Sequence, residues 1–398
     1  MPCPRPAGGA GIAYTLWRLA TSPSEPPVMP RGEAAEAALE WARHAGGQAA
    51  ARPGGRHRCS LLAGEAGVRC VGALCASAAA LHETRAGRVQ RAAALRQECR
   101  EQLAGFNALA CAACDAKICQ EDEVLYGKAG TLLSCLQLNR HLHAGAVPES
   151  TLRGLAQAIL ESGRGQAAHD PGAARLGAPL WFAWHGAPYL GAAHGLMGIL
   201  HALLLLPRPL LDSIPGALDD LRASLRLVLA LECDAAGRPG PAGFWPTRAL
   251  PRADKEPLVH WCHGSAGAVF LMAQAHEALG GGGGGGGGEA AAASEWLRAA
   301  LRAGEAVWER GLLRKGPGAC HGVSGNAYAL LRVWRATGDA RWLRRAAQFA
   351  AFMGGGEFRH GARVPDAPHS LFEGWAAACC LYADLLRPEE ARFPLFDV

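Results

Sequence analysis

The sequence lacks any run of apolar residues long enough to cross a membrane. Its most apolar stretch, Ile199–Leu206, is far shorter than the roughly 20 residues that a membrane-spanning helix needs. Residues Met1–Ala20 are rich in proline and glycine and contain no apolar run typical of a secretion signal. We therefore expect a cytoplasmic protein with reduced cysteines and no transmembrane segment, an expectation compatible with peripheral attachment at the plasma membrane.

Charged residues are also scarce, and they are not clustered. Asp, Glu, Lys and Arg make up 19% of the 398 residues, and the formal net charge is +5. The arginines are scattered, so the basic stripe typical of a nucleic-acid-binding protein is missing. Because 50% of the residues are hydrophobic, the chain can bury a large core. These values favour a globular protein without a nucleic-acid partner.

A sustained alternation of apolar and polar residues is missing as well, which argues against β-strands. The stretch after Gly322 has apolar residues at the i, i+3, i+4, i+7 spacing of a helix, namely Ala327, Leu330, Leu331 and Trp334. Gly338 stands where such a helix would end, and a second amphipathic stretch follows at residues 340–353. The pair predicts a helical hairpin, and the pattern as a whole predicts an all-α fold.

A Gly-x-x-Gly unit followed by an apolar helical run recurs along the chain. The units are Gly8–Gly11, Gly64–Gly67, Gly127–Gly130, Gly195–Gly198, Gly264–Gly267, Gly322–Gly325 and Gly374, where Ala377 replaces the second glycine. Seven such hairpins predict an (α/α) toroid with the glycine turns at one end of an inner ring. We expect residues 1–398 to form this single domain, with the glycine run Gly280–Gly288 as a flexible loop.

Two of these units carry a cysteine and a histidine directly before the glycine, and a third carries only a histidine. The segments end in Cys262-His263-Gly264, Cys320-His321-Gly322 and His194-Gly195. Turns that meet at one end of a ring would bring these side chains together. Two cysteines and one histidine leave one position of a tetrahedral zinc open, as in catalytic zinc sites. One such cysteine alone would more often be a core thiol, but the matched pair favours zinc; the spacing leaves His263 and His321 as alternative ligands.

The motifs WCHGSAG and KGPGACHGVSGNAY resemble signature repeats of the LanC-like family, eukaryotic relatives of the bacterial lanthionine cyclases. GAAHGLMG and SLFEG resemble other repeats of that family, so the resemblance extends over all seven units. It implies an α/α toroid with a zinc ion at the mouth of its central cavity. The ligands it implies are Cys262, Cys320 and His321.

The resemblance also implies a reaction, the addition of a thiol to a dehydroamino acid in a peptide or protein. The expected thiol is glutathione, whose carboxylates would be held by Lys315 and Arg363. His194 would act as the acid or base that transfers a proton to the carbon next to the carbonyl. Each of these three also has a simpler interpretation, as a core histidine and two surface residues.

Two other classes of function stay open. A regulatory or scaffold protein that binds zinc and glutathione without catalysis would have the same residues. A glycoside hydrolase on an α/α toroid would need two carboxylates about 5–10 Å apart across the cavity. The turns carry cysteine and histidine instead, so we rank this class last.

Five further residues stand near the turns or in a motif, and for these we favour structural interpretations. Cys111 and Cys114 form a CxxC motif without a partner pair, which is more typical of reduced core cysteines than of zinc or redox chemistry. The acidic residues beside the turns are expected to hydrogen-bond to helix starts; they are Asp122, Glu123 and Glu373.

Overall fold

The structure is a computed structural model that describes residues 7–22, 28–51, 58–62, 64–250, 256–279 and 294–398. Within these ranges the chain forms helices and isolated β-bridges but no β-strand, as predicted. None of the described helices is long and apolar enough to span a membrane. The glycine run Gly280–Gly288, expected to be a flexible loop, lies outside the described residues.

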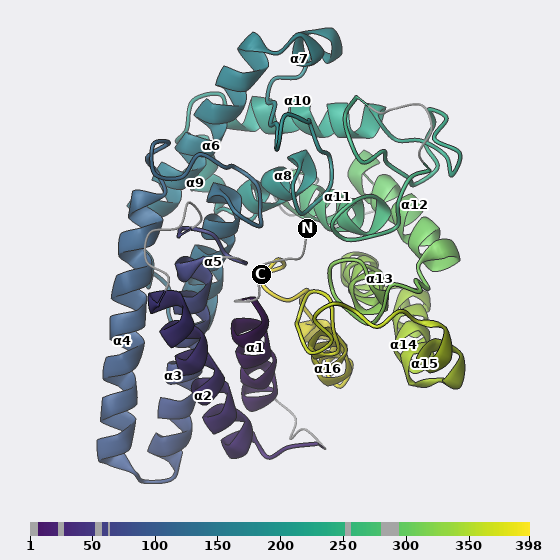
Figure 1. Cartoon of the computed structure of the whole chain (residues 1–398). Helices are drawn as coiled ribbons and strands as arrows, with labels where there is room; N and C mark the ends of the chain where they lie inside the picture. Colours follow the sequence, from purple (N-terminus) through teal and green to yellow (C-terminus); the bar gives the residue numbers. More distant parts are fainter. Residues whose placement is uncertain (1–6, 23–27, 52–57, 63, 251–255, 280–293) are drawn as a thin grey trace, which may run out of the picture.

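Seven helices form a closed inner ring, which Figure 1 shows nearly end-on. They are α1 (Ala7–Thr21), α3 (Glu65–Arg85), α5 (Lys128–His141), α8 (Leu196–Leu204), α11 (Ser265–Leu279), α13 (Val323–Thr337) and α16 (Ala376–Asp384). Each contacts the next in this order, and α16 contacts α1. The ring confirms the predicted α/α toroid.

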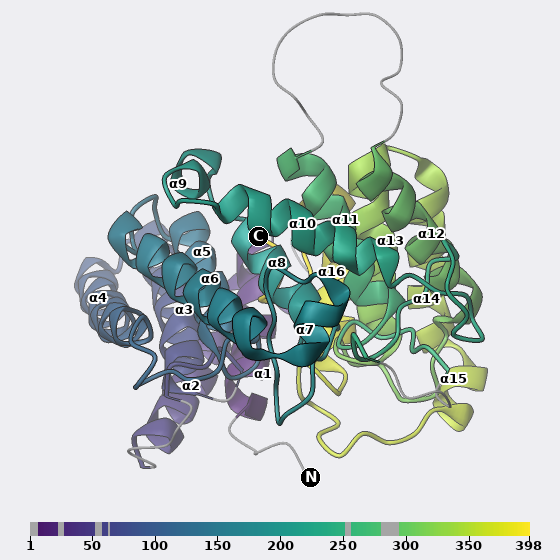
Figure 2. The same ribbon diagram turned by 90° about the horizontal axis from the view of Figure 1, so that it is seen from above.

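The outer layer consists of helices that pack against the outside of this ring (Figures 1 and 2). Its main members are α2 (Arg31–Ala50), α4 (Val89–Ala112), α6 (Glu149–His169), α10 (Ala217–Ala230), α12 (Glu295–Arg310) and α14 (Ala340–Gly354). Three short helices contact members of this layer: α7 (Pro171–Leu176) contacts α6, α9 (Arg208–Asp212) contacts α10, and α15 (Gly356–Gly361) contacts α14.

The seventh hairpin differs from the prediction, because no outer helix follows α16 in the chain. After α16 the chain forms only the 3₁₀ helix Pro388–Glu390 and then returns to the centre of the ring (Figure 1). The reason lies in the composition of this segment, Phe393-Pro394-Leu395-Phe396, which is apolar and fully buried. Its side chains pack at the axis of the ring, so this part of the chain does not form a helix in the outer layer.

The glycines of the repeated units are required by the close approach of each turn to the helix that follows it. The first glycine is the N-cap of α3, α5, α8 and α13, and Gly264 directly precedes α11. A Cβ at the second glycine would collide with a carbonyl oxygen of the turn, at 1.9 Å from Ala192 for Gly198 and 1.9 Å from Ala319 for Gly325. The first unit differs, because Gly8 lies inside α1.

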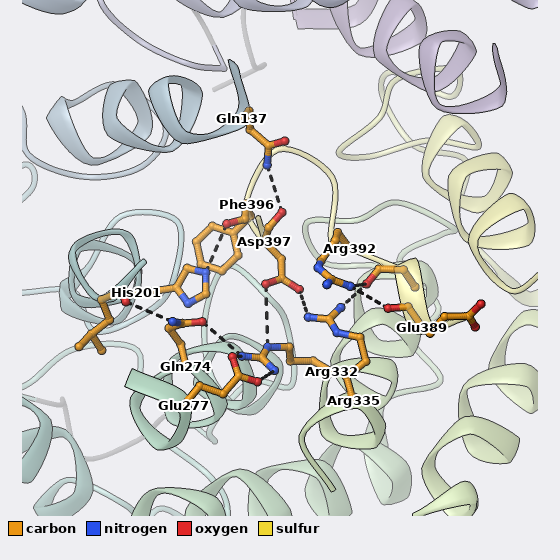
Figure 3. Close-up of polar contacts among 12 residues, drawn as sticks. Gln137, His201, Gln274, Glu277, Arg332, Arg335, Glu389, Arg392, Phe396 and Asp397 are labelled. Carbon is orange, nitrogen blue, oxygen red and sulfur yellow. Dashed lines mark hydrogen bonds and ion pairs between the residues drawn. The ribbon is translucent and has the colours of Figure 1, made fainter. Parts of the chain in front are cut away.

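The C-terminal tail, residues 391–398, packs into the ring and joins its inner helices. Phe396 stacks on His201 of α8 with ring centroids 4.2 Å apart, and Phe393 stacks on Trp261 at 4.9 Å. The buried Asp397 forms ion pairs with Arg332 and Arg335 of α13, as Figure 3 shows. The core of the molecule therefore includes the ring axis as well as the space between the two helical layers.

Candidate metal centre and active site

The turns that precede the inner helices are joined to one another by backbone hydrogen bonds. The amide of Ala193 donates to the carbonyl of Cys262, the amide of Cys262 to that of Cys320, and the amide of Cys320 to that of Phe372. Ala193, Cys262, Cys320 and Phe372 each stand two residues before the first glycine of their unit. Equivalent positions of neighbouring repeats thus become neighbours in space, which is why the two cysteines meet.

Cys262, Cys320 and His321 form a compact group of metal-ligating side chains. One donor atom from each lies within 4.8 Å of the others, and among the described residues this is the one such group that we find. Cys262 is buried, whereas Cys320 and His321 are half-buried. His263 is not a member of the group. The structure therefore places the three predicted ligands together.

The electrostatics of Cys262 favour its thiolate form. The hydrogen bond with Cys320 holds the pKa of Cys262 well below its usual value, and His260 and His321 act in the same direction. Burial acts against them, because it disfavours a charged sulfur. Thiolate sulfur and imidazole nitrogen are the donors that zinc takes most often in proteins, so this group fits a zinc ion with one open position.

His194 lies at the same end of the ring and is held on two sides. Its Nδ1 is 2.9 Å from Oε2 of Glu123, and its ring stacks on Trp184 with centroids 3.8 Å apart. Glu123 is itself buried and accepts the backbone N–H groups of Leu125 and Tyr126, which lead into α5. Burial raises the pKa of Glu123, and the hydrogen bond with His194 opposes this shift. The contact fixes the orientation of the imidazole.

Aromatic side chains surround His194, and sequence reasoning did not identify them. Tyr126 stacks beside it at 6.1 Å between ring centroids, and Tyr189 lies 5.5 Å from His263. Trp184 begins a tight turn in which His185 and Gly186 both have positive φ, and it exchanges two backbone hydrogen bonds with Ala187. The His-Gly pair in this aromatic-rich segment was the available signal, because two-residue turns of this kind favour glycine.

Lys315 and Arg363 are exposed and lie on neighbouring segments. The amide of Arg363 donates to the carbonyl of Arg314 at 2.7 Å, so the two chain segments run side by side. Burial lowers the pKa of His263, and the nearby charge of Lys315 makes a smaller contribution in the same direction. Lys315 therefore stands just before Cys320 in the chain, and the fold brings the segment of Arg363 beside it.

The remaining motif residues have structural contacts. Asp122 forms an ion pair with Lys128 at 2.7 Å and accepts the hydroxyl of Ser162, while burial raises its pKa. Cys111 is exposed, and Cys114, which follows the end of α4, donates to the carbonyl of Ala110 in that helix. Glu123 accepts amides of the turn before α5 and not of the helix start itself, and its contact with His194 was missed.

Residues 6–398 match the family model described as lanthionine synthetase C-like protein. The chain belongs to this LanC-like family. Among curated proteins, it is 37% identical to glutathione S-transferase LANCL1 of Danio rerio over 70% of the chain and 62% of that protein. It is 34% identical to LanC-like protein GCL1 of Arabidopsis thaliana over 69% of the chain and 58% of that protein.

The LanC-like chain spans about three-fifths of the length of these two relatives. Among solved structures, nisin cyclase superposes with a TM-score of 0.64 at 14% identity, covering 95% of this chain and 87% of that one. At this identity the likeness concerns the fold alone.

Proposed function

We propose that this LanC-like protein catalyses the zinc-dependent addition of glutathione to dehydroamino acids in peptides or proteins. The observation that carries the proposal is the convergence of Cys262, Cys320 and His321 at the end of the ring that also holds the Glu123–His194 pair. The name of the Danio rerio relative, a glutathione S-transferase, supports glutathione as the thiol.

The three ligating side chains would hold zinc and leave one coordination position for the substrate thiol. Zinc bound there supplies one effect, a lower pKa of the bound thiol, which makes a nucleophilic thiolate available near neutral pH. The Cys2His donor set supports a catalytic site over a structural one, because structural zinc is normally enclosed by four protein ligands.

His194 would complete the reaction by delivering a proton. Thiol addition forms a carbon–sulfur bond at the β-carbon of the dehydroamino acid, and the α-carbon then takes up a proton. Because Glu123 accepts Nδ1–H of His194, Nε2 is the ring nitrogen left for the substrate. The stacked ring of Trp184 keeps the imidazole in this orientation.

Lys315 and Arg363 would bind the two carboxylates of glutathione. Both side chains are exposed, and their segments are joined by the hydrogen bond from Arg363 to Arg314. Charge-assisted hydrogen bonds to carboxylates are among the stronger polar contacts in proteins. Membership in the LanC-like family supports thiol addition over glycoside hydrolysis.

The test combines metal analysis with a mass-spectrometric assay of glutathione addition to a dehydroalanine peptide. The wild-type protein should contain close to one zinc per chain and form the adduct. Cys320→Ala should lose most of the zinc and the activity, because it removes one of three ligands. Cys111→Ala, which changes an exposed cysteine on outer helix α4, is the matched control and should keep both.

Two results would contradict the proposal in different ways. Full zinc content in the double variant Cys262→Ala, Cys320→Ala would place the metal elsewhere. A wild-type protein that holds zinc and binds glutathione without forming any adduct would instead support a regulatory or scaffold function.

A further inference from the structure

A pocket lies at the end of the ring opposite the cysteine–histidine group, where inner helices α1, α5 and α16 end. It has a volume of about 270 Å³ and is lined mainly by ionisable and hydroxyl side chains. Among its lining residues are Arg18, Arg140, His141, Asp384, Arg387, Glu390 and Arg392. Because the cysteine–histidine group stands before the starts of α11 and α13, this pocket is remote from the proposed active site.

The two acidic residues of this pocket are already occupied by other partners. Asp384 forms an ion pair with Arg18 and accepts the hydroxyl of Tyr328 at 2.8 Å. Glu390 lies 3.4 Å from Arg387. The pocket therefore has two arginines, Arg140 and Arg392, for which no carboxylate of the described residues lies within ion-pair distance.

Arg392 is the more informative of the two, because it is half-buried. Its Nη1 donates to the backbone carbonyls of Glu389 and Ala391 at 3.1 and 2.9 Å. Its Nε is buried and has no hydrogen-bond partner. Figure 3 shows Arg392 beside Arg335, whose own charge is paired with Asp397. A buried N–H without a partner costs free energy that a bound acceptor would recover.

The surroundings of these arginines are electropositive. Burial, together with the charges of Arg335 and Arg140, lowers the pKa of Arg392 to about 10, although Asp397 acts in the opposite direction. Burial also lowers the pKa of His141 to about 4, with Arg18, Arg140 and Arg392 acting in the same direction. Like charges at short range repel one another, so a bound anion would stabilise this arrangement.

Basic residues at helix ends have a simpler explanation, since they interact favourably with the last carbonyls of a helix. That explanation accounts for Arg18 and Arg140, which lie in the last turns of α1 and α5. It accounts for only part of Arg392: Nη1 donates to carbonyls at the end of the 3₁₀ helix, but Nε is buried and unpaired.

We propose that this pocket binds a phosphate-bearing anion through Arg140 and Arg392. The two guanidinium groups without carboxylate partners match the charge of a phosphate dianion, and planar guanidinium groups bind phosphate oxygens in pairs. The volume suits a group of the size of pyrophosphate. The phosphate can belong to a soluble compound or to a lipid headgroup, and the site is independent of the proposed reaction.

Isothermal titration calorimetry with sodium pyrophosphate at low ionic strength tests the proposal on the full chain. Wild-type protein should bind, and Arg140→Ala should weaken binding roughly 10- to 100-fold, the expected loss for a charged hydrogen bond. Arg140 is exposed, so its removal should leave the fold intact, which thermal unfolding verifies. Arg226→Ala changes an exposed arginine on outer helix α10 and should leave the affinity unchanged.

A second arm identifies the source of the phosphate. Sedimentation with phosphatidylcholine vesicles, with and without phosphatidylinositol bisphosphate, is measured for the wild type and Arg140→Ala. Arg140-dependent binding of pyrophosphate would support a site for a soluble phosphate compound. Arg140-dependent binding to the vesicles that contain phosphatidylinositol bisphosphate would support a site for a lipid headgroup. The proposal is overturned if wild-type protein binds in neither arm, or if Arg140→Ala and Arg226→Ala behave alike. If pyrophosphate binds at the cysteine–histidine group instead, its affinity will not depend on Arg140, and this result would contradict the proposal.

Discussion

His194 shows how one side chain acquires a specific role through its neighbours. Glu123 fixes its Nδ1, Trp184 covers one face of its ring, and His263 lies 6.2 Å away between ring centroids. The repeat pattern placed His194 beside the turn correctly, since it stands directly before Gly195. Its partner could not be predicted, because Glu123 belongs to the preceding repeat and only the folded ring brings the two together.

We predict that His194→Ala keeps its zinc while adduct formation slows by roughly 10²–10⁴-fold, the usual contribution of a positioned acid or base. Glu123→Gln keeps a hydrogen-bonding group next to Nδ1 but removes the charge, so it should slow the reaction by about 10–100-fold. Zinc content and adduct formation are measured on the same preparations. Loss of zinc from His194→Ala would make His194 a ligand, and unchanged turnover would make it a structural residue.

At the scale of the element, the glycine turns determine how closely each inner helix follows the turn before it. In the second to sixth units, the second glycine allows a carbonyl of the turn to approach the helix backbone, as Ala192 does at Gly198. These glycines could be recognised from the sequence because the repeat is local. Their physical role follows only from the close contact between turn and helix in the structure, because an isolated Gly-x-x-Gly is also common in ordinary loops.

We predict that Gly198→Ala destabilises the protein by at least about 1–3 kcal/mol, because the new Cβ would lie 1.9 Å from the carbonyl oxygen of Ala192. Gly165→Ala is the matched control. Gly165 lies within outer helix α6 and its Cβ would meet nothing within 4 Å, so alanine should stabilise by about 0.5–1 kcal/mol. Urea unfolding of both variants gives the comparison. Equal stability of the two variants would show that the turn can relax.

At the scale of the whole molecule, the two ends of the chain close the ring. Thr15 of α1 donates to the carbonyl of Ala376, Cys380 of α16 donates to Thr15, and Arg18 pairs with Asp384. The C-terminal tail connects inner helices at the centre of the ring (Figure 3). Asp397 forms ion pairs with Arg332 and Arg335 of α13, and the backbone carbonyl of Asp397 accepts a hydrogen bond from Gln137 of α5.

Asp397 should make the free energy of unfolding depend on pH in the acidic range. Burial alone would raise its pKa, but Arg335 and Arg332 lower it from 3.8 to about 2. A carboxyl whose pKa is depressed in the folded state stabilises above its unfolded pKa, and this contribution disappears as the pH falls from about 4 to 2. Asp397→Asn should therefore cost about 2–3 kcal/mol at pH 7 and roughly half as much at pH 3.

Urea unfolding at several pH values checks this difference between the wild type and Asp397→Asn. Asp366→Asn, which changes an exposed aspartate, should track the wild type throughout. A destabilisation by Asp397→Asn that is constant from pH 7 to pH 3 would show that packing of the tail, and not the charge of Asp397, matters at this position.

The sequence by itself determined the helical content, the repeated glycine units and the positions of Cys262, Cys320, His321 and His194 within them. These features are local, because helical periodicity and turn glycines depend on residues a few positions apart. Tertiary structure decided which side chains meet: the grouping of His321 rather than His263 with the cysteines, the Glu123–His194 contact, and the replacement of a seventh outer helix by the tail. Each depends on closure of the ring, which places residues of different repeats side by side through backbone hydrogen bonds that no local pattern specifies.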